Sequence, residues 1–231
     1  MIKFEHTEVV GWEHAIRGMR NPLNSWDKSD TTCGLGEDYY TDMEIGPNDL
    51  DLMTRLRNAG TDHRKFMRML TVYVDITAPL YWWKEFDTYK VGTVANSCST
   101  MHKIHAKKFT LDDFSHEHLF DSSLCGLEEI IQRMNFWRSC FIEQSNPETR
   151  REDCVSAKEC WWQMIQLLPT SYNQKRTVML NYEVLANIYK PTSRLHHKLD
   201  EWDVDCDGSF CKWIETLPYA KELIVGNTVK E

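Results

Sequence analysis

Residues 78–102 read APLYWWKEFDTYKVGTVANSCSTMH. The pattern from Leu80 to Tyr89 predicts a short helix after the Ala-Pro step. Core packing explains the two adjacent tryptophans, but it does not explain the small polar side chains of residues 96–100 that follow them. Such a run is typical either of a polar loop without a specific function or of one half of a binding site.

The segment just before this stretch has the clearest strand pattern in the chain. In LTVYVDIT, residues 70–77, apolar side chains alternate with polar ones and β-branched residues are frequent, which predicts a strand. The remaining elements expected from the pattern are strands at 2–10 and 176–181 and helices at 12–20, 47–59, 124–141, 147–168 and 182–189.

Two segments lack a clear period. Residues 24–46 are polar and rich in Gly, Asp and Thr, which predicts a long loop, and residues 194–231 are expected to form a C-terminal helical part. Strands and helices do not alternate regularly along the chain, so the expected fold class is α+β. The length of 231 residues favours one domain that spans residues 1–231.

The composition and net charge argue against several classes of function. The formal net charge of −8 argues against broad nucleic-acid binding, because a phosphate backbone requires a basic face. No run of 18 apolar residues predicts a membrane span, and the start MIKFEHTEVV does not have the pattern of a signal peptide. The 8 cysteines form no CxxC pair, so we expect reduced thiols in a cytoplasmic protein, with a disulfide framework as the alternative.

One segment has half of a calcium-loop pattern. In DVDCDGSFCKWIE, residues 203–215, Asp203, Asp205 and Asp207 fit the first half of an EF-hand. The twelfth position, which should supply a bidentate carboxylate, is Ile214, so a polar turn between two helices is the expected structure. The histidine pairs at 116/118 and 196/197 lack further ligands at a suitable spacing, and no metal site is expected.

The chain resembles the flavin-dependent thymidylate synthases (the ThyX family). The resemblance covers about two thirds of the chain. Its anchors lie between Gly60 and His102 and again in LLPTSYNQKRTVMLNYEVL, residues 167–185. His63 precedes Ala78-Pro79 at the family's spacing, and Asn96 and Ser99 meet the asparagine and second serine of the signature R-H-R-x-x-S-x-N-E-x-S-x-R-Y. The Arg-His-Arg of that signature is replaced by Thr88-Tyr89-Lys90.

The resemblance implies a central mixed or antiparallel sheet flanked by long helices. It also implies reductive methylation of dUMP to dTMP with methylenetetrahydrofolate, FAD and NADPH, in a homotetramer whose active sites are shared between subunits. The residues it assigns are Arg194 and Ser99 to catalysis; His63, Lys90, Thr93, Asn96 and Asn181 to the cofactor; and Glu85, Ser99, Lys175 and Arg194 to the substrate.

The altered signature keeps a second hypothesis open. Lysine in place of arginine retains the charge but loses the planar fork that binds phosphate in a bidentate manner. His102 and Lys103 are candidate substitutes for the lost cations. The alternative is therefore a protein that keeps the fold and binds a nucleotide or a partner without thymidylate synthase activity.

Overall fold

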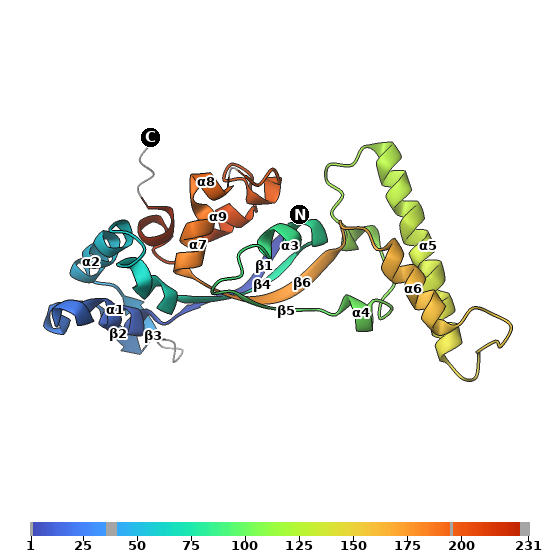
Figure 1. Ribbon diagram of the computed structural model, residues 1–231, viewed down its shortest axis with the longest axis horizontal. Coiled ribbons are helices and arrows are strands. Elements are labelled where there is room, and N and C mark those ends of the chain that lie inside the picture. The colour runs from blue at the N-terminus through green and yellow to red at the C-terminus, as the bar shows by residue number, and fades with distance from the viewer. Residues whose placement is uncertain (1, 36–40, 195, 227–231) are drawn as a thin grey trace. The chain divides into compact units, whose positions relative to one another are not determined.

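The structure is a computed structural model that describes residues 2–35, 41–194 and 196–226. It has an α+β fold with a four-stranded antiparallel sheet in the order β1-β4-β6-β5 (Figure 1). The strands are β1 (Lys3–Val10), β4 (Thr71–Pro79), β6 (Asn173–Asn181) and β5 (Val94–Ser97). The predicted alternation in β4 is confirmed, since Val72 and Val74 are buried and Tyr73 is exposed.

Helices connect these strands. The α-helices are α1 (Trp12–Arg20), α2 (Pro47–Asn58), α3 (Leu80–Phe86), α4 (Thr100–Lys103), α5 (Asp121–Ser145), α6 (Ala157–Leu167), α7 (Tyr182–Tyr189), α8 (Pro191–Arg194) and α9 (Phe210–Glu215). Short 3-10 and π segments are η1 (Asn21–Leu23), η2 (Trp26–Lys28), η3 (Arg64–Met69), η4 (Leu111–Asp113), η5 (Asp200–Trp202) and η6 (Lys221–Val225). None of the described helices is both long and apolar enough to cross a membrane.

The chain divides into two compact units. Unit 1 comprises Met1–Lys3, Ile76–Asp87 and Asn96–Arg176, and unit 2 comprises Phe4–Asp75, Thr88–Ala95 and Thr177–Glu231. Each unit has buried apolar side chains of its own. The organisation of residues 1–231 as a single domain stays a prediction.

In unit 1, the long helix α5 packs beside α6 (Figure 1). Their shared core includes Met134 and Met164, both fully buried. The two adjacent tryptophans of α3 also pack as expected: Trp82 and Trp83 are 0% and 1% exposed. The Trp83 indole N–H donates to the Gln174 carbonyl oxygen at 3.0 Å, so this ring is fixed against β6.

In unit 2, the predicted helix at 182–189 is confirmed as α7. Asn181 caps it, because its side-chain oxygen accepts a hydrogen bond from the Val184 backbone N–H at 3.0 Å. The helix is buried over nearly its whole length, with Leu185 and Ile188 at 0% exposure. Residues 203–209 form a turn between η5 and α9, which agrees with the polar-turn interpretation of that segment.

Two sequence predictions are wrong. Residues 24–46 are not one long loop, because they contain η2 and an antiparallel pair of strands, β2 (Thr32–Leu35) and β3 (Thr41–Glu44). The helix expected from residue 147 begins instead at Ala157. It is capped by Ser156, whose side chain accepts from the Glu159 backbone N–H while the Glu159 carboxylate accepts from Ser156 in return.

Candidate functional site

The residues predicted for a site fall into two groups. Unit 1 contains Glu85, Asn96, Ser99 and Lys175, and unit 2 contains His63, Lys90, Thr93, Asn181 and Arg194. Of the unit 1 group, the structure brings Ser99 and Lys175 together in one pocket. Glu85 and Asn96 have exposed side chains and do not line it.

The pocket of unit 1 has a volume of about 350 Å³ and lies where the residues after β5 meet β6. Two hydrogen bonds hold these segments together: the Cys98 backbone N–H donates to the Lys175 carbonyl oxygen at 2.9 Å, and the Gln174 side-chain amide donates to the Cys98 carbonyl oxygen at 3.0 Å. The pocket is lined by Cys98, Ser99, Thr100, Lys103, Ile104, Ala106, Lys107, Phe109, Tyr172, Gln174 and Lys175. Residues about 75 positions apart in sequence thus form one cavity.

Ser99 is positioned by the start of α4. Its hydroxyl oxygen accepts a hydrogen bond from the His102 backbone N–H at 3.0 Å, as an N-cap residue does. This contact uses a lone pair and leaves the O–H free to donate to a ligand. The same short helix carries Lys103 to the pocket wall.

The pocket is cationic. Lys103, Lys107 and Lys175 contribute three ammonium groups, of which Lys107 forms an ion pair with the mostly buried carboxylate of Asp113. The hydrogen bond to Asp113 raises the pKa of Lys107, so this group stays protonated. The ammonium groups that line the pocket would attract an anion.

Tyr172 lies at the same pocket and was not predicted. Burial raises the pKa of its phenol, and the Asp113 carboxylate raises it further. The phenol therefore stays neutral over the physiological pH range and can donate a hydrogen bond. Lys107 was also missed. The run KIHAKK at 103–108 signals local positive charge, but only the fold shows which of these lysines reach a cavity.

In unit 2, the turn before β5 packs against the start of α7. Gly92 has φ +78°, and a Cβ there would lie 2.7 Å from the Asn181 amide nitrogen. That amide donates to the Gly92 carbonyl oxygen at 3.4 Å. The Thr93 hydroxyl donates to the Tyr89 carbonyl oxygen at 2.7 Å, so Thr93 offers a ligand only acceptor lone pairs.

The altered signature position Tyr89 makes internal contacts. Its hydroxyl is 2.8 Å from His197 Nε2, and the His197 ring stacks on Trp202 with 4.2 Å between the ring centroids. His63, at the N-terminus of η3, and Lys90 have exposed side chains. Arg194 is the last residue of α8, and its side chain lies outside the described part of the structure.

No group of His, Cys, Asp or Glu side chains suited to a metal ion occurs among the described residues. No family model matches the sequence, and no curated protein matches it. The fold, by contrast, is similar to that of several solved structures.

The chain is similar to thymidylate synthase X (ThyX) from Helicobacter pylori, solved with FAD and dUMP. The TM-score is 0.60, with 16% sequence identity and coverage of 100% of this chain and 99% of that chain. A second structure of the flavin-dependent ThyX of Helicobacter pylori, also with FAD and dUMP, gives a TM-score of 0.57 with 15% identity, over 96% of this chain and 97% of that chain.

The UMP/dUMP methylase PolB from Streptomyces cacaoi matches with a TM-score of 0.49 and 8% identity, over 82% of this chain and 75% of that chain, a score too low to carry an argument. The ThyX matches extend over the whole chain, so this is an α+β protein with the ThyX fold. At this level of identity the similarity concerns the fold alone.

Proposed function

We propose that this protein is a flavin-dependent enzyme of the thymidylate synthase type that converts dUMP to dTMP with methylenetetrahydrofolate and NADPH. The observation that carries the proposal is the unit 1 pocket, in which two residues selected by the resemblance, Ser99 and Lys175, meet Lys103. The ThyX fold supports it, and the Helicobacter pylori structures of that fold contain FAD and dUMP.

The donor set of the pocket fits a nucleotide phosphate. Lys103 and Lys175 provide charge, the Ser99 hydroxyl provides a neutral donor, and Tyr172 provides a phenol. A dianionic phosphate would be attracted by the ammonium groups of Lys103 and Lys175. Ser99 and Arg194 are the residues that we propose to contact the reacting nucleotide, with Glu85 as an acceptor for a base N–H.

The accessible residues of the signature fit a flavin cofactor. His63, Lys90 and Asn96 have exposed side chains, as a cofactor contact requires. We assign them, with Thr93 as an acceptor and Asn181 at the turn, to FAD. When bound, FAD supplies the transfer of reducing equivalents from NADPH. We further propose a cytoplasmic homotetramer in which subunits share these sites.

The direct test is spectroscopic and enzymatic. Purified protein should acquire flavin absorption bands on addition of FAD and release tritium from labelled dUMP with methylenetetrahydrofolate and NADPH. A colourless protein without measurable affinity for FAD would exclude the flavoenzyme.

The pocket itself is tested by dUMP titration calorimetry. Lys175→Ala should weaken dUMP binding about 10- to 150-fold, the effect of losing one charge-assisted hydrogen bond of about 1.5–3 kcal/mol. Lys158→Ala is the matched control, because Lys158 is an exposed lysine of α6 in the same unit and outside the pocket. Equal affinity of the two variants for dUMP would show that this pocket does not bind the nucleotide.

A second candidate function is nucleotide binding without the redox reaction. The internal contact of Tyr89 favours it, because the phenol that replaces the signature histidine is bonded to His197. This candidate predicts dUMP binding that depends on Lys175, with neither flavin uptake nor tritium release. The two assays above therefore separate the candidates.

A further inference from the structure

Unit 2 contains a second pocket that none of the predicted nucleotide-site residues lines. It has a volume of about 220 Å³ and lies between one side of α1 and the segment that follows it. The lining residues are Glu13, Ile16, Arg17, Arg20, Trp26, Ser29 and Thr31. The volume is below the roughly 300–1,000 Å³ of sites for drug-sized ligands, so it suits a small molecule.

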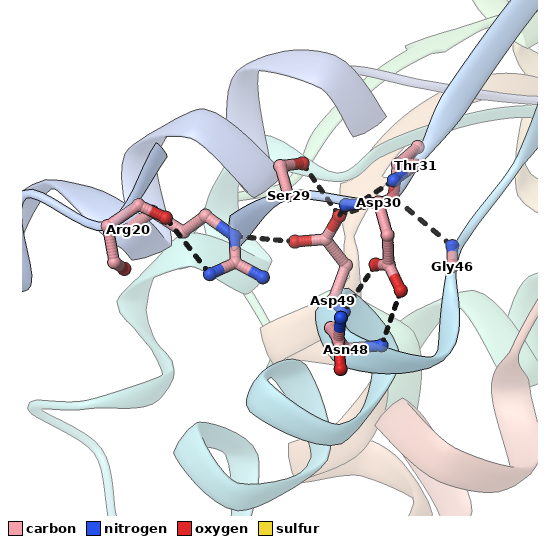
Figure 2. A network of polar contacts seen from close by, with 8 residues as sticks. Arg20, Ser29, Asp30, Thr31, Gly46, Asn48 and Asp49 are labelled. Carbon is pink, nitrogen blue, oxygen red and sulfur yellow. Dashed lines mark hydrogen bonds and ion pairs between the residues drawn. The ribbon is translucent and has the colours of Figure 1, made fainter. Parts of the chain in front are cut away.

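The buried guanidinium of Arg20 forms the inner wall. Only 4% of its side chain is exposed, and its Nε donates to Asp49 Oδ1 at 2.7 Å (Figure 2). Its Nη1 donates to the Ser25 carbonyl oxygen at 3.1 Å. These two contacts fix the orientation of the guanidinium plane. Among the described residues, no acceptor binds the remaining nitrogen, Nη2, so its N–H donors are available to a ligand in the pocket.

Asp49 cannot accept from the Nη2 donors of Arg20, because its second oxygen already accepts other hydrogen bonds. Oδ2 accepts from the Ser29 hydroxyl at 2.7 Å, the Thr31 hydroxyl at 2.7 Å, and the backbone N–H groups of Asp30 and Thr31 at 3.1 and 3.0 Å (Figure 2). The network therefore holds Arg20 in place without using all of its hydrogen-bonding capacity. An anionic ligand in the pocket would complete it.

The rim of the pocket adds a second cation and an aromatic ring. Arg17 and Glu13 lie one turn apart on α1, and neither side chain has an ion-pair or hydrogen-bond partner within the described ranges. The Trp26 side chain is 50% exposed, while its indole N–H donates to the Asn21 side-chain oxygen at 2.8 Å. The ring is thus oriented by the protein and still accessible for stacking.

The charges around the pocket decide which anion fits. The Arg20 guanidinium is paired with the Asp49 carboxylate, and the lining contains one further cation, Arg17, and one anion, Glu13. A site with this balance suits a single negative charge better than a phosphate dianion, which would leave an uncompensated charge in a partly buried place. A carboxylate also matches the planar geometry of a guanidinium.

We propose that this pocket binds a small monocarboxylate with an aromatic body. The carboxylate accepts hydrogen bonds from Arg17 and from Nη2 of Arg20, and the aromatic body packs between the Trp26 ring and the Ile16 side chain. This pocket shares no lining residue with the proposed nucleotide pocket, whose lining residues all belong to unit 1.

Benzoate is the probe that tests the site, measured by calorimetry and by saturation-transfer NMR on the full chain. We expect a Kd on the order of 1 mM, as ligand efficiency allows for so small a molecule. Arg17→Ala and Trp26→Ala should each raise this Kd at least tenfold. The Arg17 side chain is exposed, so Arg17→Ala should keep the wild-type thermal unfolding midpoint.

The controls separate this site from general ion binding. Arg55→Ala removes an exposed arginine of α2 outside the pocket and should leave benzoate binding unchanged. Benzyl alcohol, which lacks the charge, and inorganic phosphate, which lacks the ring, should both bind more weakly than benzoate. Absence of benzoate binding up to 20 times the expected Kd, or an equal effect of Arg17→Ala and Arg55→Ala, would overturn the proposal.

Discussion

Replacing Asp49 with asparagine is expected to destabilise the protein by about 3–5 kcal/mol, the cost of breaking a buried ion pair from one side. Asp49 is fully buried and accepts hydrogen bonds through both oxygens. If the asparagine oxygen faces Ser29 and Thr31, its NH₂ group faces the Nε–H of Arg20, and two donors then oppose each other. The opposite orientation places the NH₂ group against four donors.

The matched control is Asp51→Asn, the same substitution two residues along α2. Asp51 and Arg55 form an exposed pair at 2.9 Å with side chains 64% and 67% accessible, so its loss should cost no more than about 0.5 kcal/mol. Urea unfolding followed by circular dichroism measures both variants. A free energy of unfolding for Asp49→Asn within 1 kcal/mol of that for Asp51→Asn would refute the reasoning, since errors of extrapolation are about 10–15%.

The pH dependence gives an independent check on Asp49. Burial raises the pKa of its carboxyl, but the hydrogen bonds from Thr31, Ser29 and Arg20 outweigh burial and hold the pKa below its ordinary value. A depressed pKa stabilises the folded state above the unfolded pKa of about 4, and this stabilisation is lost as the pH falls through the folded value. The stability gap between wild type and Asp49→Asn should therefore persist at neutral pH and narrow below about pH 4.

Two further results are expected. Gly92→Ala should lower the free energy of unfolding in urea by about 1–2 kcal/mol, because Gly92 has φ +78° and a Cβ would meet the Asn181 amide. Gly126→Ala, in a helix with nothing within 4 Å of the new Cβ, should raise it by up to about 1 kcal/mol. Equal effects of the two substitutions would contradict this reasoning. In alkylation by iodoacetamide with peptide mapping, exposed Cys98 should react well before Cys160, because burial raises the pKa of the Cys160 thiol and blocks access; equal rates in the folded protein would disprove it.

The local elements of the fold could be predicted because their signals are short-range. The alternation in residues 70–77 predicted β4, and the helix that ends before Pro191 was predicted at its observed bounds. The burial of Trp82 and Trp83 followed from their size. The start of α6 also had a local signal, the S-x-x-E capping box at Ser156, but the Asn-Pro-Glu at 146–148 was chosen in its place.

The segment at 24–46 shows where local signals fail. Its polar residues predicted a loop, yet Ser29 and Thr31 bond to the buried carboxylate of Asp49, and the strands beyond them pair with each other. Polar composition indicates that side chains need partners, but it does not indicate whether those partners are water or a distant carboxylate.

The candidate site also contains residues that the sequence indicated singly and that only the fold brings together. Ser99 and Lys175 were selected from the sequence by resemblance, one position at a time. That they share a cavity with Lys103, Lys107 and Tyr172 was decided by the pairing of the segment after β5 with β6. Sequence patterns act over one or two turns of chain, whereas a pocket forms from residues that only long-range backbone hydrogen bonds and core packing bring together. The sequence alone therefore determined the elements with strong local patterns, such as β4 and α7, and the tertiary structure decided the pairing of β2 with β3 and which side chains share a pocket.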